Sequence, residues 1–160
     1  MPVCKVVLIA GIRQYEEIQD EMFKWMYLPY PEAVAGMKKA DAKMMEFFHS
    51  GQEILPLASI LLPAISAAKT AEARTERNIA ILRIFEAIRL YAAAHKGQLP
   101  EKLSDITEVP VPNDPIHGTA FIYNRTDLDN TAILEAPAPS GLNSEAYWLR
   151  YEIRLESKGN

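Results

Sequence analysis

Hydrophobic residues between positions 64 and 95 recur every three or four residues, which is the period of one long helix. Pro63 suits the first turn, where its missing N–H is not needed. Gly97 ends the helix, and His95 lies in the last turn, where a basic side chain complements the helix dipole. At about 1.5 Å per residue this helix is about 48 Å long, more than the width of a small domain. Its predicted buried face comprises Ile81, Ile84, Phe85, Ile88, Tyr91 and Ala92.

Two shorter amphipathic helices are predicted before the long one. The apolar positions of the first are Leu8, Ile12, Tyr15, Ile18, Met22 and Trp25. The Leu-Pro-Tyr-Pro run at 28–31 breaks it, because a residue before proline avoids the helical conformation. The second helix begins at Pro31 and ends at Gly51, with Val34, Met37, Ala40, Met44 and Phe47 inward. Five of the six methionines fall in these two helices and form either core or an adaptable binding groove.

The residues after Pro100 follow the pattern of turns and strands. A single helical turn is expected at 101–106, and 107–115 cannot form a central strand because it holds three prolines. Asn113, Asp114, Pro115 and Gly118 mark a turn. Alternating apolar and polar residues then predict an antiparallel meander, with a hairpin turn at 127–130. Its three strands are expected at 119–124, 131–136 and 147–155.

Together these elements predict an α+β fold. Long N-terminal helices, one of them about 30 residues long, pack on a small three-stranded antiparallel sheet, which is too small to be stable alone. We expect the N-terminal helices to cover the first half of the long helix, and Ile81, Phe85 and Ile88 to be buried between the sheet and those helices. The expected division is a helical hairpin-like appendage at 1–52 and a helix-plus-sheet domain at 53–160.

Composition narrows the function classes. The chain has 160 residues, 49% of them hydrophobic, and a net charge of −4. Because basic residues are not in excess, the charge does not indicate binding to nucleic acid or to an anionic membrane. The apolar stretch 54–68 is too short to span a membrane and contains two prolines, so it is interpreted as a buried connector, with a membrane-dipping segment as the alternative. The apolar run 6–12 lacks the flanks of a signal peptide. Cys4 is expected to be a small buried residue rather than a metal ligand or nucleophile.

A search for catalytic patterns predicts no catalytic, cofactor or metal site. The three histidines, His49, His95 and His117, show no metal-ligand spacing, and His95 fits a helix C-terminal cap. Asp114 and His117 can share a metal or a proton, although their segment is first a turn. The acidic cluster Glu16, Glu17, Asp20 and Glu21 is interpreted as a solvated helix face.

Several short motifs together carry a family resemblance over residues 58–136. They are Leu61-Leu62-Pro63-Ala64, then Ala67-Ala68-Lys69-x-Ala71 with Arg74 and Asn78, then Leu90-Tyr91, and Asn113-Asp114-Pro115-x-x-Gly118-x-x-Phe121-x-Tyr123. This set resembles bacterial type IV pilins and type II secretion pseudopilins, most of all the pilin-like proteins of planctomycetes. The resemblance implies a long helix packed on a small antiparallel sheet and a structural role in the cell envelope.

The chain departs from that family in two respects. The Gly-Phe-Thr-Leu-x-Glu processing site of pilins has no counterpart near residue 48, and about fifty residues of amphipathic helix come first. Major pseudopilins also bind calcium through late aspartates, for which Asp127 and Asp129 are the candidates here. Because calcium takes about six to eight oxygen ligands and no third acid lies beside them, both are interpreted as turn residues.

The expected function is a non-enzymatic structural or protein-interaction module of the bacterial cell envelope, pseudopilin-like. The alternative is a small hydrolase or metal-dependent enzyme, its site assembled from Asp114, His117, Asp127 and Asp129. Expected partners are other proteins, self-association included, and not nucleic acid; membrane contact is expected only if a longer chain carries an upstream anchor. The resemblance places the protein in the envelope or periplasm, and a chain complete as given would be cytoplasmic.

Overall fold

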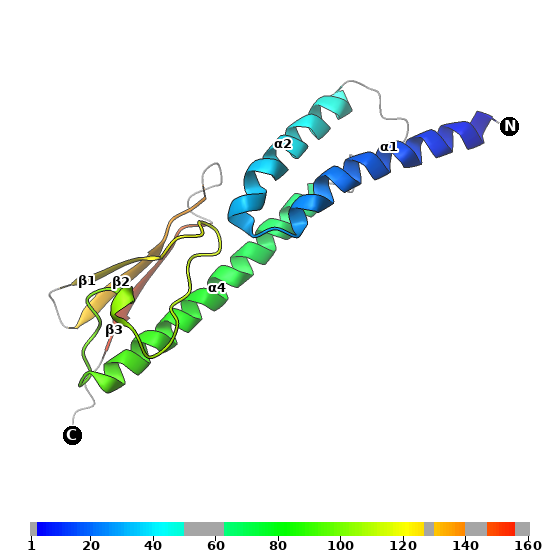
Figure 1. The fold of residues 1–160 in the computed structure, drawn as a ribbon. Helices are drawn as coiled ribbons and strands as arrows, with labels where there is room; N and C mark the ends of the chain where they lie inside the picture. Colours follow the sequence, from blue (N-terminus) through cyan, green and yellow to red (C-terminus); the bar gives the residue numbers. More distant parts are fainter. Residues whose placement is uncertain (1–2, 50–62, 127–129, 140–146, 156–160) are drawn as a thin grey trace. The chain divides into compact units, whose positions relative to one another are not determined.

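The computed structural model describes residues 3–49, 63–126, 130–139 and 147–155 (Figure 1). These residues form an α+β fold with three α-helices, one 3₁₀ turn and a three-stranded antiparallel sheet. The chain divides into two compact units, Met1–Arg74 and Thr75–Asn160, and the boundary between them falls inside the longest helix. The elements in chain order are α1 (Val3–Met26), α2 (Tyr30–His49), α4 (Pro63–Ala94), η1 (Leu103–Asp105), β1 (Ile122–Thr126), β2 (Thr131–Ala136) and β3 (Leu149–Arg154).

In the first unit, α1 and α2 are joined through a break at Pro29, as the sequence predicts. The Pro29 carbonyl accepts hydrogen bonds from the amides of Glu32 and Ala33 at 3.0 Å and so starts α2. The Trp25 ring lies against Gly36, where a Cβ atom would come within 2.3 Å of the ring. A side chain at position 36 would therefore separate the two helices.

The small core of this unit confirms much of the predicted inward face of α2. Met37, Ala40 and Met44 are buried, and Val34 is half-buried. Met22 of α1 joins Ala40 and Met44 in one cluster. The Phe47 side chain, Gly51 and the predicted domain boundary at 52 lie outside the described residues.

Polar contacts join the first turns of α4 to the other helices of this unit. The buried Lys69 side chain donates from Nζ to the Met26 carbonyl at 3.0 Å, at the end of α1, and forms an ion pair with Glu72 at 2.9 Å. Ser66 donates its hydroxyl to the Asp41 carboxylate at 3.0 Å. The expectation that the N-terminal helices cover the start of the long helix is therefore confirmed at these positions.

The second unit consists of the rest of α4 and the sheet, whose strands lie in the order β1-β2-β3 (Figure 1). Leu134 of the central strand pairs with Tyr123 on one side and with Tyr151 on the other. The buried residues of its core are Ala80, Ile81, Ile84, Ala87, Ile88, Leu99, Leu103, Ile106, Phe121, Ala132, Leu134 and Ala136.

The predicted apolar face of α4 is confirmed in this core, with one correction. Ile81 and Ile88 are buried, but Phe85 is only half-buried and meets Tyr151 edge-to-face at 5.5 Å between ring centroids. Within this unit the sheet and the loop 99–121 cover this face of the helix.

Two strand boundaries differ from the prediction, each for a local reason. β1 begins at Ile122 rather than at 119, because the Thr119 carbonyl accepts a hydrogen bond from the Asp114 amide at 2.8 Å and so belongs to the preceding turn. β3 begins at Leu149 rather than at 147, and the Tyr147 carbonyl is bound by an arginine of α4.

The C-terminus of α4 is capped as the sequence predicts. The amide of Gly97, which has a φ of 80°, donates to the Ala92 carbonyl at 2.8 Å. The His95 ring stacks on Tyr91 and its Nδ1 donates to the Tyr91 carbonyl at 2.8 Å. The Asn130 side chain then binds both Gly97 and Leu99, which ties this helix end to the start of β2.

Candidate functional site

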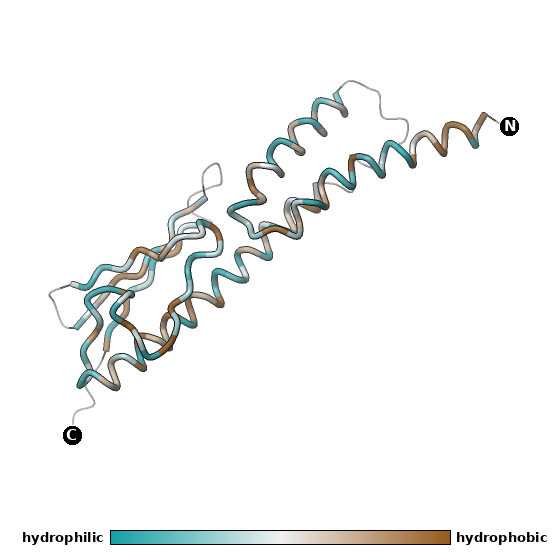
Figure 2. Tube along the Cα trace, in the orientation of Figure 1, coloured by the Kyte–Doolittle hydropathy of each residue, from teal (hydrophilic) through white to brown (hydrophobic). Residues whose placement is uncertain are grey.

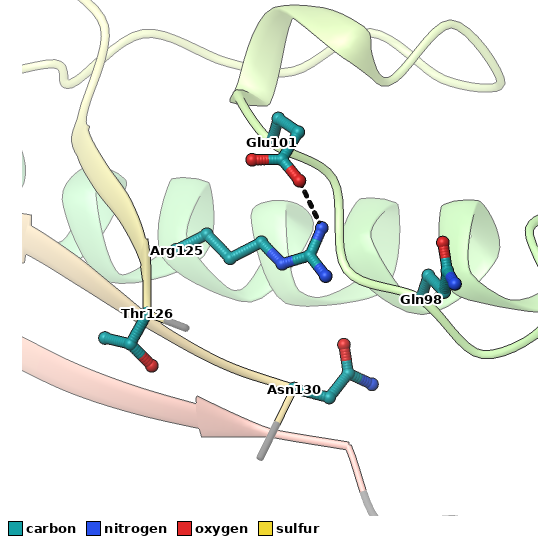
Figure 3. Close-up of a pocket in the computed structure, with 5 residues that line it drawn as sticks. All are labelled: Gln98, Glu101, Arg125, Thr126 and Asn130. Atoms are coloured by element: carbon teal, nitrogen blue, oxygen red, sulfur yellow. Dashed lines mark hydrogen bonds and ion pairs between the residues drawn. The ribbon is translucent and has the colours of Figure 1, made fainter. Parts of the chain in front are cut away.

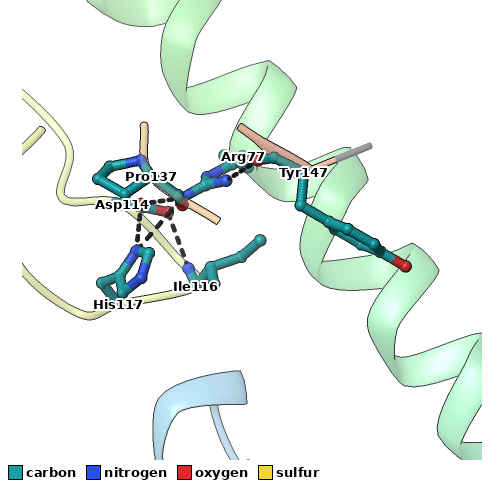
Figure 4. Close-up of polar contacts among 6 residues, drawn as sticks. All are labelled: Arg77, Asp114, Ile116, His117, Pro137 and Tyr147. Carbon is teal, nitrogen blue, oxygen red and sulfur yellow. Dashed lines mark hydrogen bonds and ion pairs between the residues drawn. The ribbon is translucent and has the colours of Figure 1, made fainter. Parts of the chain in front are cut away.

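The most extensive polar network in the described part of the second unit surrounds Arg77, a residue of α4 that is only 1% exposed (Figure 4). Its guanidinium group binds the Asp114 carboxylate through two hydrogen bonds. Nε lies 2.9 Å from Oδ1, and a terminal nitrogen lies 2.5 Å from Oδ2. This paired geometry is the strongest that arginine and a carboxylate form, and it fixes the orientation of both groups.

Arg77 also binds two backbone carbonyls of the sheet. It donates to Pro137, directly after β2, at 2.7 Å and to Tyr147, two residues before β3, at 2.9 Å. One side chain therefore connects α4, the turn at 114–118 and the two ends of the β2–β3 connection. We call this group the Arg77 clamp; its residues are Arg77, Asp114, His117, Pro137 and Tyr147.

The turn at 114–118 is built around Asp114, which is 2% exposed. Its Oδ1 accepts a hydrogen bond from the Ile116 amide at 2.9 Å, and its carbonyl accepts one from the amide of Gly118 at 2.7 Å. Gly118 has a φ of 71°, which glycine adopts without strain. Burial raises the pKa of Asp114, but hydrogen bonds from Arg77, His117 and Ile116 outweigh it and hold the pKa below 3.8.

His117 lies at the outer edge of the clamp, with 33% of its side chain exposed. Its Nδ1 is 2.8 Å from Oδ2 of Asp114 and 3.2 Å from a terminal nitrogen of Arg77. Because the ionised carboxylate only accepts hydrogen bonds, Nδ1 must carry the proton and donate to it. The contact between Nδ1 and the terminal nitrogen of Arg77 is then a contact between two donors. Nε2 of His117 is the ring nitrogen that can accept a proton.

Among the described residues, the clamp brings one histidine and one carboxylate together beside Arg77. Figure 4 shows the Tyr147 side chain pointing away from His117, so its hydroxyl is not placed as a nucleophile. Across the described residues no group of three or more His, Cys, Asp or Glu side chains is arranged to hold a metal ion. Asp114 and His117 supply two such groups, one fewer than a protein zinc site uses.

Of the other candidate residues, the structure describes His49 and His95. Asp127 and Asp129 are outside the described residues. His49 ends α2, and its Nδ1 is 2.6 Å from the Met45 carbonyl. His95 caps α4, as predicted.

Two further expectations have clear outcomes. Cys4 is exposed, so the prediction that it is buried is wrong; it lies in the first turns of α1, where the neighbouring side chains are exposed too. The acidic cluster is a solvated helix face, as predicted, with Glu16, Glu17 and Asp20 exposed and Glu21 paired with Lys24.

Sequence reasoning missed Arg77, the centre of the clamp. One signal was present, because Arg77 is in helical register with the buried Ala73, Ala80 and Ile84 and so lies on the apolar face of α4. A charged residue in that register requires a buried partner. The partner, Asp114, is 37 residues away, and the sequence pattern does not connect the two.

A second polar site is a shallow pocket of about 380 Å³ lined by Gln98, Glu101, Arg125, Thr126 and Asn130 (Figure 3). Arg125 forms an ion pair with Glu101 and donates to the Leu99 carbonyl at 3.2 Å. The Asn130 side chain is bound to Gly97 and Leu99. The polar groups of this pocket therefore serve mainly to fasten the loop after α4 to the sheet.

Comparisons with protein-family models, with curated proteins and with solved structures find no match for this chain. No helix in the described ranges is long and apolar enough to cross a membrane.

Proposed function

We propose that this chain is a non-enzymatic structural or protein-interaction module of the bacterial cell envelope, with a pseudopilin-like core. The observation that carries the proposal is the use of the Arg77 clamp. Its guanidinium group donates hydrogen bonds to one buried carboxylate and two backbone carbonyls, and these contacts hold the fold together. Such a network holds the unit in one rigid conformation, and a structural module binds its partners through a surface of fixed shape.

The pilin-like interpretation is supported by where the resembling motifs fall. Pro63 begins the long helix, and Asp114 and Gly118 form the turn that the clamp holds. Phe121 is 5% exposed in the core, and the Tyr123 hydroxyl donates to the Pro100 carbonyl at 3.0 Å. These residues support the packing of a long helix on a small antiparallel sheet, which is the arrangement that the resemblance implies.

Other proteins, further copies of this chain among them, are the proposed partners. The solvated face of β3 carries charges of both signs, which suits contacts with a protein surface rather than with nucleic acid. Arg154 pairs with Glu152 at 2.9 Å, and Arg150 lies 3.5 Å from Glu135 of β2. The Arg154–Glu152 pair is exposed and can exchange for a pair with a partner at little cost, and the Arg150 end of the second pair is exposed too.

The second candidate is a small hydrolase, which one observation favours. A buried carboxylate holds the His117 ring at 2.8 Å, and this is how catalytic histidines are oriented. Such an enzyme also requires a nucleophile, or a metal-bound water, within hydrogen-bond distance of Nε2.

The test of the proposal combines location with activity. Cells that express the gene are fractionated, and cross-linking is applied before lysis. We expect the protein in envelope fractions, cross-linked to itself or to other envelope proteins. With the purified chain we expect no turnover on ester, peptide and phosphoester panels. A cytosolic location, or a turnover that is lost in His117→Ala while the melting temperature is kept, would favour the hydrolase.

A further inference from the structure

The first three turns of α1 form an exposed apolar surface, which we call the apolar tip. Its large side chains are Val3, Val6, Val7, Leu8, Ile9 and Ile12, and they are 38% to 77% exposed. Figure 2 shows this end of α1 as a continuous hydrophobic segment. The other exposed large hydrophobic residues of the described chain are spread over four elements and the loops. Single exposed hydrophobic residues are normal, but a continuous group of this kind marks an interaction site.

Large apolar side chains are exposed on opposite sides of the apolar tip, and Gly11 is its one buried residue. Successive residues of a helix are rotated by about 100°, so Val7 and Ile9 point in nearly opposite directions. Both are exposed, and the periodic stripe that Leu8 and Ile12 share with the rest of α1 is exposed here too. A partner helix covers one stripe and leaves the opposite side in water. Hydrocarbon covers all sides of such a helix at once.

Charge distinguishes the apolar tip from the rest of α1. Lys5 and Arg13 are the only charged residues between positions 3 and 15, and both are basic. Four acids follow directly, at Glu16, Glu17, Asp20 and Glu21. Anionic lipid headgroups attract the two bases and repel the acids. The charge pattern therefore selects which part of the helix enters a membrane and where entry stops.

We propose that the apolar tip inserts into one leaflet of an anionic lipid bilayer. Lys5 lies in the first turn of α1, and an end-on entry would carry its charge toward the bilayer centre. The apolar tip therefore enters at a shallow angle, with its apolar side chains buried by about 5–10 Å and Lys5 near the headgroups. The contact belongs to α1 itself and requires no upstream anchor. This proposal does not depend on the proposed function, because purified protein and lipid are enough to test it.

Cys4 provides the probe, because it is the single cysteine of the chain and is exposed within the apolar tip. The full chain is labelled there with an environment-sensitive fluorophore and mixed with vesicles of phosphatidylcholine and phosphatidylglycerol in equal amounts. We expect a blue shift, quenching by spin-labelled acyl chains, and weaker binding to phosphatidylcholine alone or at high salt. A fluorophore placed on α4 by Cys4→Ser with Glu86→Cys should show no shift.

Matched substitutions then test whether the side chains of the apolar tip carry the binding. Ile9→Asp should weaken vesicle binding by about tenfold or more, because a carboxylate must leave water. Leu82→Asp is the control, since Leu82 is 62% exposed on α4 and should leave binding unchanged. Far-UV circular dichroism should be the same for all three proteins. The proposal is overturned if the label at Cys4 does not respond to vesicles, or if both substitutions weaken binding equally. It is also overturned if the blue shift occurs without lipid and grows with protein concentration, which would assign the apolar tip to self-association.

Discussion

Two arginines of the second unit perform a similar task in very different surroundings. Arg77 and Asp114 have side chains that are 2% and 3% exposed, whereas Arg125 and Glu101 are 30% and 74% exposed. Each arginine binds one carboxylate and also donates to backbone carbonyls, two for Arg77 and one for Arg125, so the chemistry of the contacts is alike. The difference lies in what happens to the partners when the arginine is removed. Water reaches Glu101 at once, but it cannot reach Asp114 without opening the fold.

Burial therefore determines how much the free energy of unfolding depends on each arginine. A buried carboxylate that loses its partner keeps its full cost of desolvation, whereas an exposed one returns to water. The number of hydrogen bonds is a poor guide to this difference, because both arginines make several. The comparison predicts a large effect at the Arg77 clamp and a small one at Arg125.

The largest effect is expected for Arg77→Ala. It leaves Asp114 buried without its cation and removes the hydrogen bonds that Arg77 donates to the carbonyls of Pro137 and Tyr147, so we expect a loss of about 3–5 kcal/mol in the free energy of unfolding. Urea denaturation measures it. Arg89→Ala is the matched control, because Arg89 lies on the same helix in an ion pair that is 70% exposed, and its loss should be below about 0.5 kcal/mol. Equal effects of the two substitutions would contradict the role of burial.

The second expected effect is that the free energy of unfolding falls as Asp114 is protonated in acid. The pKa of Asp114 is lowered in the native state from 3.8, so its stabilisation is complete above that value and is lost as the pH falls through the native pKa. Asp114→Asn keeps the shape but not the charge. Urea midpoints from pH 7 down to about pH 2 should show the wild type approaching this variant, because the unfolded chain takes up a proton that native Asp114 resists. A gap that stays constant over this range would show that the charge of Asp114 is not the source of stability.

The third effect concerns Tyr123, whose hydroxyl donates to the Pro100 carbonyl beside Arg125. Burial raises the pKa of Tyr123 from 10.0 to about 12. Its contribution is therefore complete below pH 10 and is lost as the pH rises toward 12, because the unfolded chain ionises first. Tyr123→Phe should cost about 1 kcal/mol at neutral pH and should abolish this alkaline component in urea melts. Ultraviolet titration should show a tyrosine that ionises near pH 12 in the wild type and is missing from the variant, and a variant with an unchanged titration curve would refute the assignment.

The sequence predicts most of the fold because its regular elements repeat a local pattern. The face of α4 and the alternation of β3 need no knowledge of distant residues, and both are confirmed. The start of β1 depends on a hydrogen bond between Asp114 and Thr119, which no periodicity records. The exposure of Leu8 was also missed, because an apolar stripe predicts a covering surface without showing that one is present.

The candidate site was predicted only in part, for a related reason. Asp114 and His117 were identified because they lie three residues apart in a turn with a distinct composition. Arg77 was missed because an arginine in a helix is usually solvated, and only its pairing across the unit makes it central. Local patterns thus reveal turns and faces, whereas buried ion pairs depend on which segments the fold brings together.

The smallest effect is expected for Arg125→Ala, and it sharpens the opening comparison. Its ion pair with Glu101 is open to water, so we expect a loss of about 1 kcal/mol or less, most of it removed at high salt. Glu101→Gln should behave alike, because each substitution leaves its former partner solvated. Urea denaturation at low and high ionic strength measures both. A loss that matches Arg77→Ala and does not respond to salt would mean that the bond from Arg125 to the Leu99 carbonyl, rather than the ion pair, holds the loop after α4 against the sheet.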